Sequence, residues 1–490
     1  MSGEFLIQAA LIVPLLTAVG IAVFGKVPNI REGVTIVGAS VLFFVSCLIA
    51  SQTGQGTPPE LVVGDAAPGL TFAFKLEPLG AVFMLVASGL WIVNSFYSIG
   101  YMRGNRERNQ TRFYICFAIA LFGVMGVAMA GNLFTLFVFY EVLSLATFPL
   151  VAHKGDANAL RGARIYLMTL LGTSIGLFLV AIVWTYTIAG SLDFVQGGLL
   201  NGQVGTGVGG VLLILFAFGI GKAALMPIHF WLPNAMVAPT PVSALLHAVA
   251  VVKAGVFSVL KVAIYIFGQD LLNAMPATEW ILGIACFTII VASLIAITKD
   301  NLKARLAYST VAQLAYVTTG AMLADPAGWL GGAIQIVAHA SGKITLFMCA
   351  GAIYVATGLA NISDMRGLGR RMPIVFIAFF IGALSIIGIP PLAGDWAKYE
   401  LMQGAADADK SYVVAVLIIS SLLNVAYLLP IPILALMPPP GTPEPAPLKR
   451  PEGAPFFTVA APVFTAGLCF VLFFTVGYLG EFLTPAVGVR

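Results

Sequence analysis

One stretch of the chain shows most directly what class of protein this is. Residues 328–357 read GWLGGAIQIVAHASGKITLFMCAGAIYVAT, and about 20 apolar residues are enough to cross the hydrocarbon core of a bilayer as an α-helix. Gln335, His339 and Lys343 interrupt the run at intervals of four residues, so they share one face of a helix. We therefore expect a membrane-spanning helix with a polar stripe along an otherwise apolar surface.

The rest of the chain has the same character. Of its 490 residues, 59% are hydrophobic and 9% charged, whereas about a quarter of the residues in soluble domains are charged. Apolar runs separated by charged or Gly/Pro-rich breaks predict fourteen helices. They lie at residues 5–25, 33–51, 79–100, 112–130, 132–152, 163–188, 208–231, 240–267, 280–298, 306–323, 328–357, 372–403, 411–437 and 456–480. We expect an all-α polytopic membrane protein.

Several kinds of site are not expected. The first apolar run lacks the basic start and small-residue cleavage site of a signal peptide, so we expect it to be retained as a helix. The cysteines lie far apart in apolar segments, without a C-x-x-C pair, at Cys47, Cys116, Cys286, Cys349 and Cys469. This spacing fits neither an iron–sulfur cluster nor a zinc site. We expect no cofactor, no metal and no nucleic-acid partner.

The loops between the fourteen helices form two alternating sets that differ in positive charge. One set holds Lys26, Arg31, Arg103, Arg106, Arg108, Arg112, Lys154, Arg161, Arg164, Lys299, Lys303, Arg305, Arg366, Arg370, Arg371, Lys449 and Arg450. The other set, with both termini, holds only Lys75, Lys410 and Arg490. Because cytoplasmic loops are enriched in Lys and Arg, this bias supports the helix count. It predicts an inner-membrane protein with both termini on the non-cytoplasmic side.

The remaining Lys and Arg residues all lie inside predicted helices, and all are lysines: Lys222, Lys253, Lys261, Lys343 and Lys398. A charge at the bilayer centre costs at least about 2.5–3.5 kcal/mol, so these residues need a reason to be there. Lysine can release its proton when it is desolvated, whereas arginine effectively cannot. A set of lysines without arginine is therefore typical of a proton relay, while a structural salt-bridge network would more readily use arginine.

Two of the buried charges invite simpler interpretations. Lys261 lies about two turns from the outer end of its helix, where its ammonium group is expected to snorkel to the interface. Glu141 is the only carboxylate in an otherwise unbroken apolar helix, and a buried pair with a lysine would resolve the cost of both charges.

Histidines and helix breaks accompany the lysines. His247 precedes Lys253 by six residues, about 9 Å along a helix axis. Lys222 lies in the Gly-rich segment 219–227, which ends in a proline, and Lys398 ends the segment 388–398, which contains two prolines. Corresponding breaks in two halves of a transporter point to binding sites, because freed backbone groups face a water-lined cavity.

A combination of motifs resembles the antiporter-like subunits shared by respiratory complex I and the Mrp-type multisubunit cation/proton antiporters. The motifs are Tyr140-Glu141, HFWLPNA at 229–235, APTPVSALLH at 238–247, LAYST at 306–310, HASGK at 339–343 and GIPP at 388–391. The resemblance runs from about residue 75 to about residue 430. It implies three N-terminal helices in residues 1–111, two inverted five-helix repeats at 112–267 and 280–437 with helices 7 and 12 broken, and a loop with helix 14 at 438–490.

The resemblance also implies a hydrophilic axis through the membrane. By position, Glu141 and Lys222 match the glutamate of helix 5 and its lysine partner on helix 7. The other matches are Lys253, Lys343 and Lys398, the lysines of helices 8, 11 and 12, and His247 and His339, the histidines beside the axis. The chain departs from the family at two positions. Gln335 replaces a second histidine found in some members, and Asp395 replaces a common aromatic residue and is a candidate partner for Lys398.

These features predict a subunit that moves protons or monovalent cations within a larger membrane complex. The chain has no long lateral helix after helix 14, which favours an Mrp D-like or a complex I M/N-like subunit. Exchange of Na⁺ or K⁺ for H⁺ in an Mrp assembly is the first expectation. Proton pumping within NADH:quinone oxidoreductase or a related membrane hydrogenase is the alternative, since both would use the same axis. A structural subunit that has lost transport would show decay of the axis, and the axis residues are all present.

Overall fold

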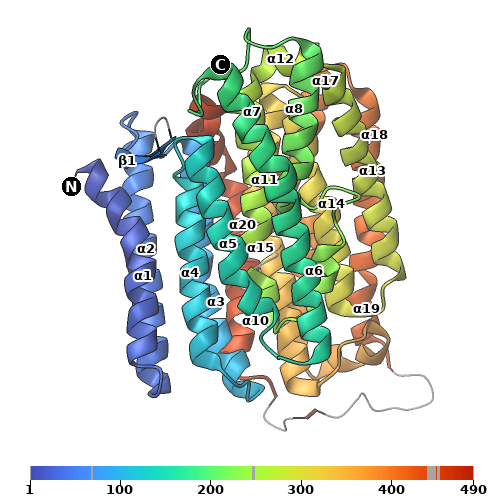
Figure 1. Cartoon of the computed structure of the whole chain (residues 1–490). Coiled ribbons are helices and arrows are strands. Elements are labelled where there is room, and N and C mark those ends of the chain that lie inside the picture. The colour runs from blue at the N-terminus through green and yellow to red at the C-terminus, as the bar shows by residue number, and fades with distance from the viewer. Residues whose placement is uncertain (1, 68–69, 246–248, 439–447, 450–452, 489–490) are drawn as a thin grey trace.

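The structure, a computed structural model, describes residues 2–67, 70–245, 249–438, 448–449 and 453–488. Within these ranges, eleven helical segments are long and apolar enough to cross a membrane. They are α1 (Gly3–Val23), α2 (Pro28–Gly54), α3 (Pro78–Gly104), α4 (Gln110–Ala128), α5 (Leu133–Val151), α6–η1–α7 (Ala157–Thr173, Ser174–Phe178, Leu179–Ala189), α11–η5–α12 (Val251–Val262, Ala263–Phe267, Gly268–Ala274), α13 (Pro276–Thr298), α15 (Pro326–Thr357), α18–α19 (Ser411–Leu428, Pro430–Leu436) and α20 (Phe456–Val487). Figure 1 shows them side by side in one bundle, with α1 and α2 as a pair at one edge.

The remaining helices are shorter or more polar. They are α8 (Thr206–Gly219), η2 (Gly221–Ala223), α9 (Trp231–Asn234), η3 (Ala235–Val237), α10 (Thr240–Ala244), α14 (Leu302–Met322), η6 (Ile362–Met365), η7 (Leu368–Arg370), α16 (Pro373–Ile387) and α17 (Gly394–Asp407). With these, each of the predicted helices has a counterpart, and the all-α polytopic fold is confirmed. The division into two inverted repeats at 112–267 and 280–437 stays a prediction.

Both predicted helix breaks are present, and local chemistry explains them. α8 ends at Gly219 because Ile220 leaves the helical conformation, with a ψ of 58°. The chain then passes through η2, and Pro227 has no N–H with which a helix could continue there. α16 ends at Ile387 because Gly388 adopts a φ of +81°, a conformation that favours glycine. The chain resumes as α17 at Gly394.

A small β-hairpin is an addition to the predicted fold. It consists of β1 (Glu60–Ala67) and β2 (Leu70–Lys75), which pair antiparallel. An isolated bridge between Phe74 and Ala130 fastens it to the connection between α4 and α5. The hairpin lies at the same end of the bundle as the start of α1 and the end of α20 (Figure 1).

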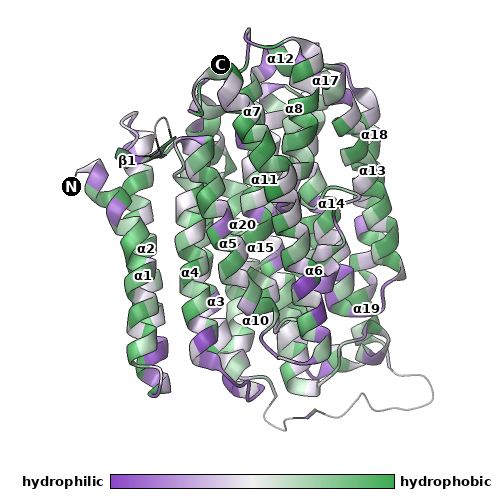
Figure 2. Ribbon diagram, in the orientation of Figure 1, coloured by the Kyte–Doolittle hydropathy of each residue, from purple (hydrophilic) through white to green (hydrophobic). Residues whose placement is uncertain are grey.

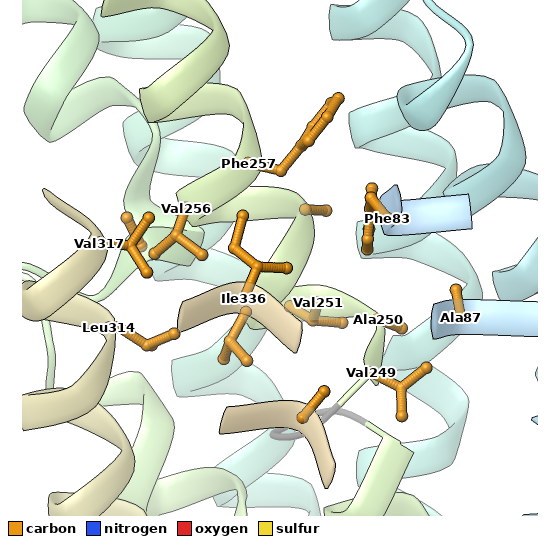
Figure 3. Close-up of a cluster of buried hydrophobic side chains, with 14 of the residues drawn as sticks. Phe83, Ala87, Val249, Ala250, Val251, Val256, Phe257, Leu314, Val317 and Ile336 are labelled. Atoms are coloured by element: carbon orange, nitrogen blue, oxygen red, sulfur yellow. The ribbon is translucent and has the colours of Figure 1, made fainter. Parts of the chain in front are cut away.

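The helices α11 and α15 form the centre of the bundle. Every residue of α11 is buried, as is nearly every residue of α15. Apolar side chains of α3 and α14 pack against those of these two helices, as Figure 3 shows for Phe83 of α3, Val256 of α11, Leu314 of α14 and Ile336 of α15. A polar side chain on α11 or α15 therefore needs hydrogen-bond partners from the neighbouring helices.

The outer helices turn apolar side chains outward. Met168, Trp280 and Phe474 are each at least 70% exposed, which in water would be an aggregation hazard but in a bilayer is contact with lipid. Figure 2 shows hydrophobic colour along most of the helices, with hydrophilic colour mainly near the two ends of the bundle. The chain is a multi-pass membrane protein.

Candidate functional site: the buried lysine axis

All five intramembrane lysines lie inside the protein. Lys222, Lys253, Lys261 and Lys343 are fully buried, and Lys398 is 5% exposed. A buried ammonium group requires hydrogen-bond acceptors or a counter-charge, because transfer out of water is costly. The partners of each lysine therefore define the site.

Lys222 of η2 is held by α5, and above all by Tyr140. The backbone N–H of Lys222 donates to the Tyr140 hydroxyl at 3.1 Å, and its Nζ donates to the Tyr140 carbonyl at 2.8 Å. The Nζ also donates to Ser144 Oγ at 2.6 Å and lies 3.1 Å from the centroid of the Tyr140 ring. The broken helix thus places this ammonium group against one turn of α5.

The predicted contact pair between Glu141 and Lys222 is not formed. No ion pair shorter than 4 Å joins these two described residues, because the ammonium group is occupied by Tyr140 and Ser144. Both carboxylate oxygens of Glu141 are buried, and neither has a hydrogen-bond partner among the described residues. Glu141 still acts on Lys222 through its charge, so the two interact across a longer distance than expected.

Lys253 and His339 join the two central helices. Lys253 Nζ of α11 lies 2.6 Å from His339 Nδ1 of α15, within hydrogen-bond distance. The predicted neighbour of Lys253 on its own helix, His247, lies outside the described residues. The hydrogen bond to His339 was not expected from the sequence, because residues 253 and 339 lie on different predicted helices.

Lys343 lies one turn beyond His339 and contacts α14. Its Nζ donates to Ser309 Oγ at 2.5 Å and to the Leu306 carbonyl at 3.4 Å. Ser309 also accepts a hydrogen bond of 2.8 Å from the Tyr427 hydroxyl of α18. One turn before His339, Gln335 donates to Gln313 of α14 at 2.7 Å. The polar stripe predicted on residues 328–357 therefore faces α14 and α11.

Lys398 of α17 occupies the second helix break. Its Nζ donates to the Ile387 carbonyl, freed by the end of α16, and to Ser421 Oγ of α18 at 2.8 Å. Asp395, the candidate partner, forms no ion pair shorter than 4 Å with Lys398, although both residues are described and their charges interact. The freed carbonyl takes the place expected for the carboxylate.

Three lysines share one arrangement of neutral partners. Lys222, Lys343 and Lys398 each donate to one serine hydroxyl and one backbone carbonyl. A hydroxyl accepts a hydrogen bond from an ammonium group and donates one to a neutral amine. In this structure Ser144 and Ser421 donate to carbonyls of their own helices, so their hydroxyl groups would rotate to donate to a neutral lysine.

The interpretation of Lys261 as a snorkelling residue is wrong. Its side chain is fully buried, and its Nζ lies 3.3 Å from Glu77 Oε2, a carboxylate at the start of α3. It also donates to the Ala130 carbonyl at 2.7 Å. The ammonium group is therefore held by partners inside the protein and does not extend to the interface. Among the described residues, Lys261 is the one lysine of the five with a carboxylate within 4 Å.

The partners of the lysines were not predicted from the sequence. Ser144, Ser309, Ser421 and Glu77 received no role, although Ser309 lies in the LAYST motif and Ser144 lies one turn after Tyr140. Serines are common in membrane helices, and single residues of this kind carry no distinct signal. Among the described residues, no group of three or more His, Cys, Asp and Glu side chains is placed to hold a metal ion.

The family of the chain follows from comparison with known proteins. Residues 130–424 match the family model described as "NADH:quinone oxidoreductase/Mrp antiporter, TM". The chain belongs to this family. Residues 66–114 also match the model described as "NADH-Ubiquinone oxidoreductase (complex I), chain 5 N-terminus". The resemblance to antiporter-like subunits is therefore confirmed, and the lysine axis lies largely within the matched region.

Several relatives of this antiporter-like protein are similar over most of its length. The N subunit of the NADH-quinone oxidoreductase of Desulforudis audaxviator is 31% identical, with 85% of this chain and 83% of that protein covered. The D subunit of the Na⁺/H⁺ antiporter of Alkalihalophilus pseudofirmus is 28% identical, with 84% and 82% covered. The match to NAD(P)H-quinone oxidoreductase chain 5 of Synechocystis sp. is 30% identical and spans 63% of that longer protein. These relatives support the prediction of a cation- or proton-translocating membrane subunit.

Solved structures share the fold of this antiporter-like protein. A chain of the Mrp complex from Dietzia sp. DQ12-45-1b has a TM-score of 0.86 at 22% identity, with 99% of this chain and 97% of that chain covered. A chain of respiratory complex I from Thermus thermophilus has a TM-score of 0.76 at 24% identity, with 98% and 99% covered. Both are parts of multisubunit membrane complexes.

Proposed function

We propose that this chain translocates protons along the row of buried lysines, as the D-like subunit of an Mrp-type Na⁺(K⁺)/H⁺ antiporter in the inner membrane. The observation that carries the proposal is the hydrogen bond between Lys253 and His339. It joins two bases, each able to gain or lose a proton, across the interface of the two central helices. Such a pair holds a proton between α11 and α15.

The route begins at Glu141 and Lys222. When the charge of Glu141 is neutralised or drawn away, the Lys222 ammonium group loses its long-range counter-charge, and its neutral partners Tyr140 and Ser144 remain for the amine. The proton then passes through water and His247 to Lys253, and across the hydrogen bond to His339. A positive charge on Lys253 repels positive charge on the neighbouring residues of the axis. The arrival of a proton at Lys253 therefore favours the release of the proton ahead of it.

The second half of the route runs from His339 to Lys398. His339 and Lys343 lie one turn apart on α15, and Ser309 links Lys343 to Tyr427 of α18. Ser421, the partner of Lys398, lies on α18 as well. Hydroxyl groups of α14 and α18 thus lie beside both Lys343 and Lys398. From the second helix break the proton reaches one face of the membrane.

Proton pumping as part of NADH:quinone oxidoreductase is the second candidate. It is favoured by the 31% identity to an N subunit of that enzyme over 85% of the chain. The same axis would serve both functions, with partner subunits supplying either the exchanged cation or the redox energy. In either case we propose that other membrane subunits surround the chain, and that its termini face away from the cytoplasm.

The test uses the chain together with the products of its neighbouring genes. They are expressed in a host without its own Na⁺/H⁺ antiporters, and proton movement in everted vesicles is followed with a pH-sensitive dye. Release of protons on addition of NaCl or KCl identifies the antiporter, and NADH-driven uptake identifies the redox pump. Lys343→Ala and Glu141→Gln should each lower the rate at least tenfold at unchanged assembly. Wild-type rates in both variants would refute the proposal.

A further inference from the structure

The Glu77–Lys261 pair lies outside the route described above. Glu77 is the residue that precedes α3, and its side chain is 10% exposed, whereas Lys261 of α11 is fully buried. The Lys261 ammonium group also lies 4.4 Å from the centroid of the Phe194 ring. The pair is therefore a buried ion pair near the end of the bundle that carries the hairpin.

A cavity leads from this pair to the surface. Its volume is about 350 Å³, and its lining includes Glu77, Phe194 and Tyr265 at the buried end. Exposed residues form the rim, namely Lys75, Gln196, Glu481 and Pro485. Since Glu77 faces the cavity and Lys261 lies behind it, the carboxylate stands between the lysine and the water outside.

The opposite side of Lys261 faces the lysine axis. Lys253 and Lys261 lie eight residues apart on α11, about 12 Å along the helix and about 80° apart around its axis. Phe257 lies between them, 5.7 Å from the Lys261 ammonium group, measured to the centroid of its ring. Its ring packs 5.0 Å from that of Phe83, and Figure 3 shows the two side chains facing each other between α3 and α11. Two aromatic rings thus separate Lys261 from the axis.

We propose that Glu77 and Lys261 form a proton-exchange site that connects the lysine axis, at Lys253, with the membrane face opposite the arginine-rich loops. In this arrangement the Phe83–Phe257 ring pair is the barrier between the axis and the exchange site. The proposal rests on the proposed function, because it requires that protons move along the axis.

The transfer conserves charge at each step. Lys261 gives a proton to the Glu77 carboxylate, which converts the ion pair to a neutral amine and a carboxylic acid. Glu77 then releases this proton to water in the cavity, and the Lys261 amine takes up a proton from Lys253 through water admitted past the rings. The opposite order of steps carries a proton inward.

The charges around the site are compatible with both directions. Besides the pair itself, the titratable and charged groups that face the cavity are Lys75 from β2, Tyr265 from η5 and Glu481 from α20. Lys75 also forms an ion pair with Glu60 of β1. Lys75 and Glu481, which line the cavity, carry opposite charges.

The alternative is that the Glu77–Lys261 ion pair only stabilises the packing of α3 against α11. The double variant E77Q/K261M removes both charges and leaves no unpaired ion. We expect it to assemble normally and to lower the rate of proton movement at least tenfold. The control is K410M/E279Q, which neutralises the Lys410–Glu279 pair, 2.7 Å apart at the periphery between α13 and α18, and should leave the rate unchanged. A wild-type rate in E77Q/K261M would overturn the proposal.

A second variant applies if the double variant fails to assemble. K261R keeps the positive charge and the ion pair, which is all that a stabilising role requires. Arginine does not release its proton, however, so K261R cannot exchange protons. Loss of at least tenfold of the rate in assembled K261R supports the exchange site, and retention of the rate overturns it. Lys343→Ala in the same vesicles separates the two proposals. If it abolishes transport while E77Q/K261M and K261R do not, only the exchange site is wrong; if it has no effect, the axis itself is wrong.

Discussion

Lys253 Nζ and His339 Nδ1 lie 2.6 Å apart and join the two helices at the centre of the bundle. Lys253 has no carboxylate within ion-pair distance among the described residues. The two bases are thus linked to each other, and the protonation of one depends on that of the other.

This dependence predicts a non-additive double-mutant cycle. Lys253→Met and His339→Ala should each lower the transport rate at least tenfold, and the double variant should be no slower than the slower single variant, because either change removes the shared hydrogen bond. The rates are measured by dye response in everted vesicles and normalised to the amount of assembled complex. A double variant whose loss equals the product of the two single losses would show that the residues act independently.

The variant Lys343→Arg distinguishes the effect of a positive charge at residue 343 from the effect of proton release by that residue. Arginine keeps the positive charge and its hydrogen-bonding capacity but does not give up its proton, so we expect at least a tenfold loss of transport at normal assembly. Lys410→Arg, outside the axis, is the control and should retain the wild-type rate. If assembled Lys343→Arg kept more than half of that rate, Lys343 would have an electrostatic role only.

Ser309 tests the role of the hydroxyl partners. Ser309→Ala removes acceptors for both Lys343 and Tyr427, and a hydrogen bond to a charged group contributes about 1.5–3 kcal/mol. We therefore expect a transport loss of about tenfold or more, with recovery in Ser309→Thr, which restores a hydroxyl. Ser46→Ala, whose hydroxyl bonds only within α2, serves as the control. Equal rates in the Ala and Thr variants would contradict a role for the hydroxyl.

Gly255 tests the packing of the broken helix. A Cβ at this position of α11 would lie 2.4 Å from the backbone of Lys222 and Ala223, closer than any real contact. Gly255→Ala should displace Lys222 from Tyr140 and lower transport at least tenfold, by the same vesicle assay. At Gly283 a Cβ meets no atom within 4 Å, so Gly283→Ala should behave as the wild type. Similar rates in the two variants would mean that the position of Lys222 is adjustable.

Arg31, Glu32 and Arg103 form a network of ion pairs that we expect to affect the stability of the protein but not transport. Glu32 accepts hydrogen bonds from Arg31 at 3.1 Å and from Arg103, and it ties α2 to α3. Removing one partner of a buried pair costs about 3–5 kcal/mol; since Arg103 is half-exposed, Glu32→Ala should lie at or below the lower end of this range. We expect a lower unfolding temperature in detergent, with transport per assembled complex unchanged. The exposed Glu4 is the control, and equal unfolding temperatures for Glu32→Ala and Glu4→Ala would contradict the structural role.

Much of the fold could be predicted because it depends on local properties of the chain. The length of each apolar run determines whether it can span a bilayer. Gly388 and the prolines near residues 227 and 390 predicted the helix breaks, because they act on their own backbone. The β-hairpin at residues 60–75 was missed, since two short strands outside the membrane change neither hydropathy nor charge balance.

The row of lysines was likewise visible in the sequence, because counting charges along apolar helices needs no contact information. The partners of those lysines depended on tertiary structure. Lys222 was expected to pair with Glu141 but contacts Tyr140 and Ser144 instead, and Lys261 was expected to reach the interface but pairs with Glu77. A lysine side chain is long and flexible, so its sequence position leaves several acceptors within reach. Which acceptor it uses is decided by the helices that pack against it, and those contacts exist only once the bundle has formed.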